Sequence, residues 1–573
     1  MHNPFARPCG ALFSLMLCAS SIAPASAAID IDLSYVNQSS PQYQRFKSWV
    51  DLAVDGNPGY LFSATDAATM YKLTGQAQYA QLAVAMAEEQ VADAEAEIAS
   101  NQSPDVAGDS YLYVGDMIGD VAITYDWCAS FMTPSQRTRW AAYAEQAIYN
   151  VWNPNQASWG GHSFPWSGWS IDNPANNYFY SFLQATMYWS LANDSTPWMD
   201  FLNTVKIPLL TSYFANIEGG GSQEGTGYGL SHKTLFGLYR VWRDSTGVDL
   251  ANENSHLTDT ISWWIHATVP TLDRTAAIGD QARVSEPVMY DYHRALMLQA
   301  RKMTLDTTAQ NIASWWLHNI SVQQMDSGFN YRDDLLPAGG SGTLPPAELV
   351  YHAIGTGQLF ARTSWDTSAM WLQFGAGPFL ESHAHQDQGA FTLYQNTWLA
   401  VTENIWSHSG IQQGTDVHNM LRFEHSGSIV PQVVGTTSTM TVTPNGGGSV
   451  HAVADLTPAY DGNSAVQSWQ RTIDFVGHTL TVHDVYSTGS NTQAIFQIDT
   501  PGRPTTSGNT ATAGALRIQV VSPANATLQA VDFTTLDNDF NSGWRLDISG
   551  GSGEYIVQLS TDVTNEIFAN GFD

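Results

Sequence analysis

A short polar segment in the second half of the chain combines the side chains that acid–base chemistry and metal binding use. Between Glu381 and Phe391, two histidines and an aspartate stand at alternate positions, as His383, His385 and Asp387. Residues two apart share one face of an extended segment, so these side chains would point the same way if the strand begins this early. Imidazole and carboxylate groups on one face suit proton transfer, metal ligation or both. The alternative is a solvated loop in which the spacing has no function.

A glycine-rich stretch in the first half offers a second set of reactive groups. Residues 218–232 contain Glu224, Tyr228 and His232 among several glycines. Glycine lets the backbone approach a ligand closely or adopt unusual φ values. The stretch is not a phosphate-binding loop, because no strand precedes it and its lysine spacing is wrong. It therefore predicts a loop that delivers a glutamate, a tyrosine and a histidine at the start of a helix.

Two adjacent asparagines, Asn176 and Asn177, open a strongly amphipathic segment. An asparagine at a helix start is ordinarily an N-cap. Here the pair is followed by Tyr178 and preceded by a tryptophan-rich stretch that ends at Trp169. Aromatic rings form flat apolar platforms for sugars, although they are also ordinary core residues. The arrangement favours the rim of a carbohydrate-binding cleft.

The charge balance restricts the partners. The chain has 22 basic and 53 acidic residues and a formal net charge of −31. Such a charge argues against nucleic acid and anionic membrane surfaces as ligands, and it disfavours a densely sulfated glycan. Acidic surfaces are common in exported proteins, so the charge alone identifies no substrate.

The N-terminus predicts export. Residues 1–27 combine a weakly basic start, a short apolar core and a small-residue cleavage site, which indicates a signal peptide and a secreted or periplasmic protein. No later apolar stretch is long enough to predict a membrane span. Cys9 and Cys18 leave with the peptide, so Cys128 remains without a partner for a disulfide. Its apolar surroundings favour a buried inert thiol over a nucleophile.

Two regions of different periodicity position these groups. Residues 28–335 show apolar residues at three- and four-residue spacing in paired segments, which predicts an all-α arrangement such as a helical toroid. Thr133, Pro134 and Gln136 form a helix-start signal with a capping box. A Gly- and Pro-rich linker follows, and residues 345–563 show short alternating runs typical of an antiparallel β-sandwich. Residues 564–573 are predicted to form a C-terminal tail.

In combination these motifs resemble the heparinase II/III-like polysaccharide lyases. The resemblance covers most of residues 110–425, and each motif alone is weak. It rests on the following stretches: Tyr125-Asp126-Trp127, Asn176-Asn177 followed by an aromatic residue, Glu224-Gly225-x-x-Tyr228, Arg362-Thr363-Ser364-Trp365-Asp366, and His383-x-His385-x-Asp387-x-Gly389-x-Phe391. The resemblance implies an N-terminal (α/α) toroid, a C-terminal antiparallel β-sandwich, and cleavage of an acidic, uronate-containing polysaccharide or oligosaccharide by β-elimination.

The resemblance also implies roles for particular residues. Tyr228 matches the catalytic tyrosine, Asn177 the asparagine that neutralises the substrate carboxylate, and His383 the catalytic histidine of the β domain. Asn176, Tyr178, Glu224 and Trp169 are expected to contact substrate. His385, Glu403 and His418 fall where related enzymes hold a structural zinc, although that acidic ligand is more often aspartate. A hydrogen-bonded cluster without metal is the alternative.

One departure from the family pattern leaves open which residue of the helical domain acts as the base. Many members have histidine after the paired asparagines, whereas this chain has Tyr178. Either Tyr178 or His232 replaces it, or Tyr228 is both base and acid, or the chemistry differs on the same scaffold. The leading hypothesis is a lyase, with alginate-like or other uronate polymers ahead of heparin. The alternatives are a glycoside hydrolase that uses Glu224 with Asp387, and a non-catalytic glycan-binding protein. The sequence does not decide the oligomeric state.

Overall fold

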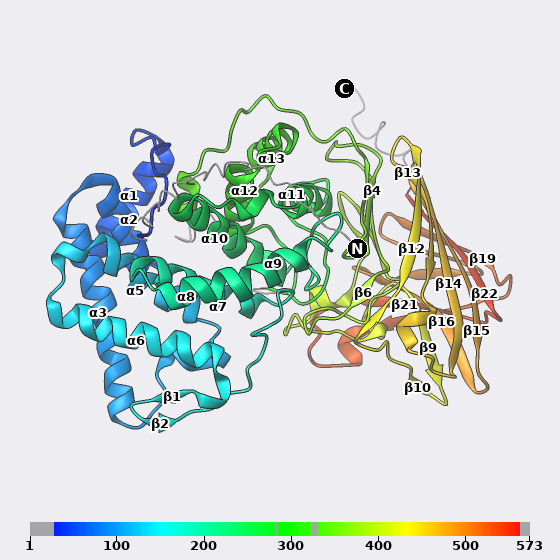
Figure 1. The fold of residues 1–573 in the computed structure, drawn as a ribbon. Coiled ribbons are helices and arrows are strands. Elements are labelled where there is room, and N and C mark those ends of the chain that lie inside the picture. The colour runs from blue at the N-terminus through cyan, green and yellow to red at the C-terminus, as the bar shows by residue number, and fades with distance from the viewer. Residues whose placement is uncertain (1–27, 282–283, 323–330, 562–573) are drawn as a thin grey trace, which may run out of the picture.

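The computed structural model describes residues 28–281, 284–322 and 331–561. It consists of a helical part followed by a strand-rich part, joined by an extended linker that crosses from one to the other (Figure 1). The predicted signal peptide, residues 1–27, and the predicted tail, residues 564–573, lie outside the described residues. The predicted order of a helical toroid and an antiparallel β-sandwich is confirmed.

The helical part contains the following helices: α1 (Pro41–Val54), α2 (Ala64–Thr74), α3 (Ala77–Ala99), α4 (Gly108–Tyr111), α5 (Val114–Trp127), α6 (Pro134–Trp152), α7 (Asn177–Ala192), α8 (Thr196–Phe201), α9 (Ile207–Phe214), α10 (Ser231–Thr246), α11 (His256–Ala267), α12 (Asp291–Met303) and α13 (Thr307–Asn319). Local sequence signals set several of these bounds. At the start of α6, the Thr133 hydroxyl accepts a hydrogen bond from the Gln136 amide, and the Gln136 side chain accepts one from the Thr133 amide, at 3.2 and 2.8 Å. The predicted capping box is therefore present.

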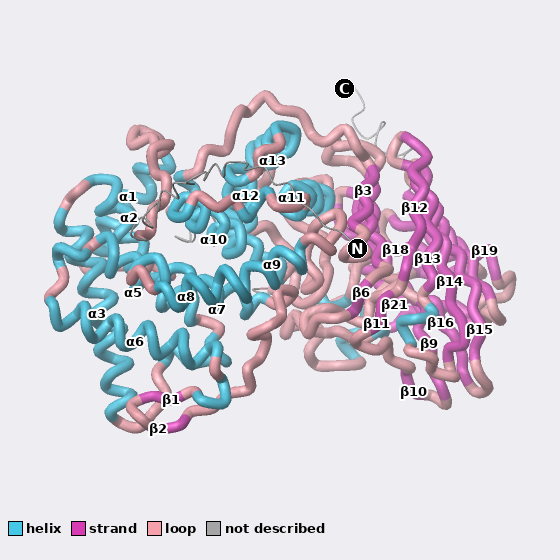
Figure 2. Tube along the Cα trace, viewed as in Figure 1, coloured by secondary structure: helices cyan, strands magenta, loops and turns pink. Residues whose placement is uncertain are grey.

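The helices form two rings, as expected for a toroid. Helices α2, α5, α7, α10 and α12 pack against one another in succession and form the inner ring. Helices α1, α3, α6, α8, α11 and α13 pack against their outer side (Figure 2). Large aromatic side chains such as Trp140, Trp189 and Trp264 are fully buried between the layers. Much of the high tryptophan content thus fills the core and does not line a sugar cleft.

The strand-rich part contains the following strands: β3 (Val350–Ala353), β4 (Gln358–Arg362), β5 (Trp371–Gly375), β6 (Pro378–Phe379), β7 (Phe391–Gln395), β8 (Thr397–Ala400), β9 (Leu421–His425), β10 (Ser428–Ile429), β11 (Thr436–Thr437), β12 (Thr439–Gly446), β13 (Ser449–Asp455), β14 (Val466–Val476), β15 (Thr479–Thr488), β16 (Thr492–Thr500), β17 (Thr505–Ser507), β18 (Thr510–Ala513), β19 (Leu516–Ser522), β20 (Thr527–Asp532), β21 (Trp544–Ser549) and β22 (Glu554–Thr561). They form an antiparallel five-stranded sheet β3-β4-β5-β7-β8, an eight-stranded sheet β12-β13-β14-β15-β22-β19-β18-β17, and a second five-stranded sheet β10-β9-β16-β21-β20. A small hairpin, β1 (Ser158–Trp159) with β2 (His162–Ser163), lies in the helical part.

The sheet β3-β4-β5-β7-β8 is the layer between the two parts. Phe360 and Trp371 pack with the helical core, whereas Leu359 and Leu372 pack with the core of the β-sandwich. Because successive residues of a strand face opposite sides, this double contact explains why every residue of β5 is buried. The sheet therefore holds the β domain against the toroid.

A buried arginine fastens this sheet to α11. The guanidinium of Arg362 donates hydrogen bonds to the carbonyl oxygens of His266 and Thr268, at 3.0 and 2.7 Å, and stacks on the Trp365 ring at 3.8 Å. The carbonyls at a helix C-terminus lack intrahelical partners and carry partial negative charge, so a cation is favourable there. This contact fixes the position of the β domain against α11 of the toroid.

Two further expectations can be compared with the structure. Among the described residues, no helix is both long and apolar enough to cross a membrane. Cys128 is buried and free, and burial raises the pKa of its thiol to about 12, which makes it a poor nucleophile.

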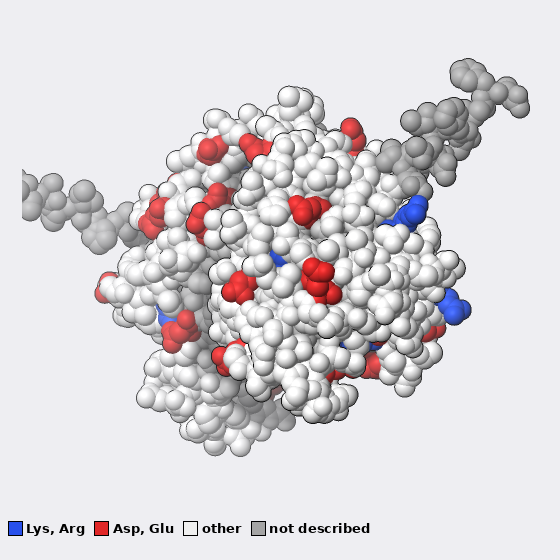
Figure 3. Space-filling model, turned by 90° about the vertical axis from the view of Figure 1, so that its right-hand side faces the viewer, with Lys and Arg blue, Asp and Glu red and all other residues white. Residues whose placement is uncertain are grey.

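The face formed by the β domain shows scattered acidic side chains and few basic ones (Figure 3).

Candidate active site

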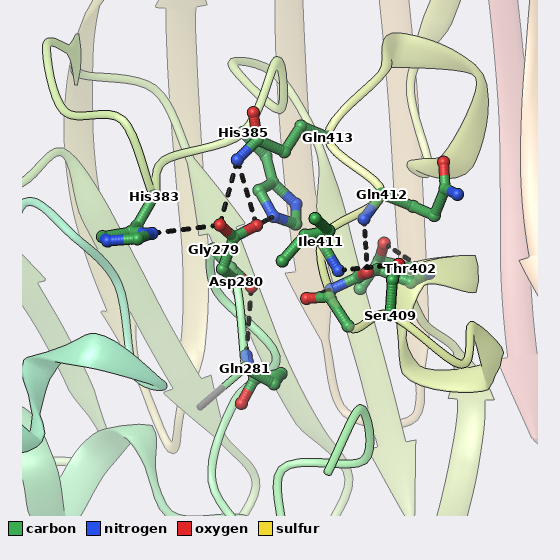
Figure 4. Close-up of polar contacts among 12 residues, drawn as sticks. Gly279, Asp280, Gln281, His383, His385, Thr402, Ser409, Ile411, Gln412 and Gln413 are labelled. Carbon is green, nitrogen blue, oxygen red and sulfur yellow. Dashed lines mark hydrogen bonds and ion pairs between the residues drawn. The ribbon is translucent and has the colours of Figure 1, made fainter. Parts of the chain in front are cut away.

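Asp280 connects the two histidines of the polar segment. Its Oδ2 lies 3.1 Å from His383 Nδ1, and its Oδ1 lies 2.9 Å from His385 Nε2 (Figure 4). The Gln413 side-chain amide donates to both carboxylate oxygens, at 3.1 and 3.0 Å. Burial alone would raise the pKa of Asp280, but the hydrogen bonds from His383 and His385 outweigh it and hold that pKa below its usual value. An ionised Asp280 therefore fixes the orientation of both rings.

Three loops meet at this carboxylate because glycines allow their backbones to touch. The Asp280 amide donates to the His383 carbonyl at 2.9 Å, and the Thr226 amide donates to the Ile278 carbonyl at 2.9 Å. Between them, Gly279 has φ of +70°, and a Cβ there would lie 2.6 Å from the Glu224 carbonyl oxygen and 2.7 Å from that of His383. Only glycine fits this position. The glycine-rich stretch is thus part of the seam between the domains.

Tyr228 and His383 form the contact between the toroid and the β domain at this seam. Their rings are stacked, with centroids 3.6 Å apart and planes inclined by 3°. Tyr228 begins a short 3-10 helix before α10, and His383 lies in the loop before β7. Burial, followed by the charges of Asp280 and Glu224, raises the pKa of Tyr228 above its usual value. The tyrosine is therefore protonated at neutral pH in the free protein.

Asparagine side chains bind two glutamates beside this pair. Asn176 caps α7 and donates to Glu224 Oε1 at 3.2 Å and to Glu381 Oε2 at 3.5 Å. Asn173 donates to both oxygens of Glu381, at 3.0 and 3.2 Å. Glu224 and the asparagines belong to the toroid, whereas Glu381 comes from the β domain. This network is a second connection across the domain boundary.

Glu224 and Asn177 each have a buried side-chain oxygen without a hydrogen-bond partner. Glu224 is fully buried, its Oε2 is unpartnered, and its Oε1 lies 3.9 Å from His383 Nε2. Burial and the nearby carboxylate of Glu381 raise the pKa of Glu224 well above its usual value, despite the opposing effect of the Asn177 backbone amide. The Asn177 Oδ1 is also buried without a partner. Unpaired buried polar atoms are costly and concentrate at functional sites.

The other residues expected in the site differ in their environment. The Tyr178 hydroxyl donates to Asp109 at 3.0 Å, and burial together with that carboxylate raises the pKa of Tyr178 to about 12. His232 lies in the core, where its Nδ1 accepts a hydrogen bond from Trp264 at 3.2 Å and burial lowers its pKa to about 3. Trp169 is 46% exposed in the loop before α7. The surroundings of His232 are those of a structural histidine.

The polar segment does not begin a strand as early as the spacing allowed. His383, His385 and Asp387 all lie in the loop that precedes β7, which starts at Phe391. The alternation rule for strands therefore does not apply to them, and both histidines reach the same carboxylate, that of Asp280. Burial raises the pKa of Asp387 to about 6.

The three residues expected to bind zinc are partly brought together. His385 Nδ1 and His418 Nε2 lie 3.2 Å apart, a separation compatible with two ligands of one tetrahedral zinc at ~2.0–2.1 Å. Glu403 is fully buried, and neither of its carboxylate oxygens has a hydrogen-bond partner. Within the described ranges, however, no group of three or more His, Cys, Asp or Glu side chains is gathered as a metal site. The donor types fit zinc, and the metal stays a prediction.

Sequence reasoning missed the residues that hold the site together. Asp280 lies between Gly279 and Gln281 in a loop without a recognisable motif, and Gln413 is equally unmarked. Glu381 begins the polar segment and Asn173 lies just before the paired asparagines, yet nothing in their spacing indicates that they meet. The one sequence signal for Asp280 is its place directly after a glycine in a segment without helix or strand periodicity.

Comparison with known proteins gives the fold class. Scans against sequence models of protein families and against curated protein sequences gave no match. Solved structures do match over nearly the whole chain, and polysaccharide lyases are among them. The chain therefore has the toroid-plus-sandwich fold of that class.

The particular structures are heparinase III, a heparan sulfate lyase and a chondroitin AC lyase. The heparinase III structure has a TM-score of 0.63 at 11% identity, over 94% of this chain and 87% of that one. The heparan sulfate lyase from Pedobacter heparinus has a TM-score of 0.56 at 15% identity, over 93% and 85%. The chondroitin AC lyase from Streptomyces coelicolor, in complex with chondroitin sulphate, has a TM-score of 0.51 at 10% identity, over 91% and 83%. Such low identities establish the fold alone.

Proposed function

We propose that this protein is a secreted polysaccharide lyase that cleaves a uronate-containing acidic polysaccharide or oligosaccharide by β-elimination. One observation carries the proposal: the ring of Tyr228 is stacked on that of His383, which Asp280 orients. A tyrosine and an oriented imidazole, delivered by two different domains, provide an acid–base group and a polar donor in one place. The fold shared with heparinase III and chondroitin AC lyase supports the same class of reaction.

The chemistry requires a neutralised substrate carboxylate. The proton on C5 of a uronate becomes acidic only when the charge that develops on the carboxylate is stabilised. In our proposal the Asn177 amide and His383 supply polar donors for this charge. Glu224, whose Oε1 lies 3.9 Å from His383 Nε2, adds a carboxyl group with an unpartnered Oε2 beside them.

Tyr228 completes the reaction as base and then acid. The ionised hydroxyl takes the C5 proton, and the electron pair left on C5 forms the C4–C5 double bond. The bond from C4 to the glycosidic oxygen breaks, and the departing oxygen takes a proton from Tyr228. The enzyme returns to its starting state without an external oxidant or reductant.

The test is the absorbance of the product. A lyase product carries a C4–C5 double bond conjugated to the carboxylate, which absorbs in the ultraviolet, whereas hydrolysis and simple binding give no such signal. Purified protein is incubated with alginate, pectate, glucuronan and glycosaminoglycans. We expect absorbance to rise with alginate-like or other low-sulfate polymers, because a net charge of −31 disfavours a densely sulfated ligand. No increase with any of them would refute the proposal.

A glycoside hydrolase remains the second candidate because of one observation. Asn176 Nδ2 lies within 3.5 Å of both Glu224 and Glu381, so two carboxyl groups lie close together at the site. Hydrolases use a pair of carboxyls about 5–10 Å apart. New reducing ends without ultraviolet absorbance in the same assay would favour this reaction over elimination.

A further inference from the structure

Two carboxylates in the core of the β domain have no hydrogen-bond partner for either of their oxygens. Glu403 begins a short 3-10 helix, Glu403–Trp406, and Asp499 lies near the end of β16. Both side chains are fully buried, and both oxygens of each carboxyl group are unpartnered. Buried charged groups are costly unless they are paired or bind a metal ion, so this pair requires an explanation. The proposed elimination uses neither residue.

The two carboxyl groups lie close enough to act on each other. Burial, followed by the charge of Asp499, raises the pKa of Glu403 well above its usual value. Burial raises the pKa of Asp499 as well. The partly exposed carboxylates of Asp532 and Asp416 add negative charge beside Glu403 and Asp499, respectively. The pair therefore lies in a negative potential, which favours a bound cation.

An arginine beside the pair is engaged by other groups. Arg545 stands opposite Asp499 in the β16–β21 ladder, and its charge acts on that carboxyl group. Its donors, however, bind both oxygens of Asp547, at 2.6 and 3.2 Å, and the carbonyl oxygen of Asp416, at 2.8 Å. Arg545 is therefore the ion-pair partner of Asp547 and leaves the oxygens of Asp499 without a donor.

A second arginine is engaged in the same way. Arg422 on β9 donates to Asp547 at 3.0 Å and to Glu424 at 2.9 Å. The two arginines thus balance the charges of Asp547 and Glu424, whereas the charges of Glu403 and Asp499 stay unbalanced. One divalent cation would balance this remaining pair.

Gly543 makes room for the Glu403 carboxylate. It has φ of +105°, and a Cβ there would overlap Glu403 Oε2 and lie 2.8 Å from its Cδ. Only glycine combines this backbone conformation with the absence of a side chain. The nearby backbone amide of Trp544 favours the ionised form of the same carboxylate. The backbone before β21 is therefore shaped to hold a charged Glu403 in the interior.

We propose that Glu403 and Asp499 bind one calcium ion, at a site separate from the predicted zinc. Carboxylate oxygens suit Ca²⁺ or Mg²⁺ better than metals that prefer nitrogen and sulfur. Calcium fits better than magnesium, because it accepts irregular sets of about six to eight oxygens that include backbone carbonyls and water. The sequence placed Glu403 in the zinc site, but within the described residues no third such ligand is gathered with His385 and His418.

The segment after Glu403 connects this site to the candidate active site. Asn404 accepts a hydrogen bond from the Gln412 amide at 2.8 Å. The next residue, Gln413, donates to both oxygens of Asp280 (Figure 4). An ion bound at Glu403 would therefore order the segment that holds Asp280.

Calcium itself is the probe for the test. Purified protein is freed of calcium with EGTA, dialysed and titrated with calcium chloride by calorimetry, and its melting temperature is followed in parallel. We expect one ion per chain to bind with a Kd of ~10⁻³ M or tighter, as in extracellular calcium modules, and the melting temperature to rise with calcium. A wild-type protein that binds no calcium in this range would mean that the two carboxyls share a proton instead, and would overturn the proposal.

Two variants locate the ion. Glu403→Gln and Asp499→Asn each remove one charge and keep the shape of the side chain, so each should weaken calcium binding at least tenfold. In EGTA both should melt at or above the wild-type temperature, because they remove a buried charge that is unbalanced without the ion. Wild-type affinity in both variants would overturn the assignment. If one variant fails to fold, the other decides.

Two further variants are controls. Glu424→Gln changes a carboxylate of the same sheet that Arg422 already pairs, so calcium binding should stay within threefold of the wild type. His418→Ala should also keep calcium, because its imidazole is not a ligand of this ion. Loss of calcium binding in His418→Ala would place the ion at the histidines and overturn the proposal.

Hydrogen exchange tests the connection to Asp280 without any substrate. Calcium should slow amide exchange in residues 404–413 of the wild type at least tenfold, and it should have no effect there in Glu403→Gln. Equal protection by calcium in Glu403→Gln would overturn the role of Glu403. The result does not depend on the reaction catalysed, so the calcium site and the lyase proposal stand or fall separately.

Discussion

The ring of Tyr228 lies flat on the imidazole of His383, with the centroids 3.6 Å apart. The first residue belongs to the toroid and the second to the β domain. The hydrogen bond from His383 to Asp280, and the network of Asn173, Asn176 and Glu381, hold the two domains at this contact. The candidate site therefore exists only because the domains are packed together.

Removal of the Tyr228 hydroxyl should abolish elimination. In Tyr228→Phe the ring stack on His383 can persist, but no group remains to take the C5 proton and return it to the leaving oxygen. We expect kcat to fall by about 10²–10⁴-fold, the range for loss of a general acid–base group. The measurement is the rate of ultraviolet absorbance increase, with circular dichroism to confirm the fold.

Tyr178→Phe is the matched control for that variant. The Tyr178 hydroxyl is held by Asp109, and its pKa of about 12 makes it a poor base at neutral pH. We expect activity within about tenfold of the wild type, because the lost hydrogen bond, to the carboxylate of Asp109, involves no group of the proposed reaction. A Tyr178→Phe variant as inactive as Tyr228→Phe would transfer the role of base to Tyr178.

Asp280 should act as a positioning residue for His383. Asp280→Asn keeps the size of the side chain but replaces one carboxylate oxygen by a donor, so the hydrogen bond from His383 Nδ1 weakens or the ring reorients. We expect kcat to decrease by about 10–100-fold with little change in KM, since the substrate-binding asparagines are untouched. A change confined to thermal stability, with wild-type kcat, would limit Asp280 to a structural role.

The pH dependence of kcat/KM should reflect the raised pKa of Tyr228. Burial and the charges of Asp280 and Glu224 keep the tyrosine protonated, so the ionised fraction grows about tenfold per pH unit below its pKa. Because kcat/KM reports the free enzyme, it should rise with pH from neutral into the alkaline range. In Tyr228→Phe this rise should disappear. A flat profile between pH 6 and 9 in the wild type would exclude an ionised Tyr228 as the base.

Most of the fold could be predicted because its signals are local. The capping box at Thr133 and the asparagine cap at Asn176 set the starts of α6 and α7 within the chain itself. The apolar spacing from Glu286 onward predicts a helix that starts earlier than α12, which begins only at Asp291 because Val288 forms a β-bridge with Arg274 and Tyr290 has extended backbone. Such differences at element ends reflect local backbone geometry that periodicity does not contain.

The candidate site could be predicted only in part, because it is assembled from distant segments. Tyr228 and His383 are visible in their motifs, and the structure does bring them together. Asp280 is invisible in the sequence because its role depends on two loops that fold against Gly279. His232 shows the opposite error: its place after a glycine-rich loop suggested chemistry, whereas α10 turns its ring into the core.

The last prediction concerns the zinc that His385 and His418 are expected to bind. The two nitrogens of His385 and His418 that lie 3.2 Å apart suit two ligands of one structural zinc, but within the described residues Glu403 is not gathered with them as a third. We expect about one zinc per chain by elemental analysis, and a lower melting temperature after treatment with a chelator, because a metal that binds only the folded state stabilises it. His418→Ala should lose the metal, while Tyr228→Phe should keep it. Zinc-free wild-type protein with an unchanged melting temperature in chelator would mean that this cluster is held by hydrogen bonds alone.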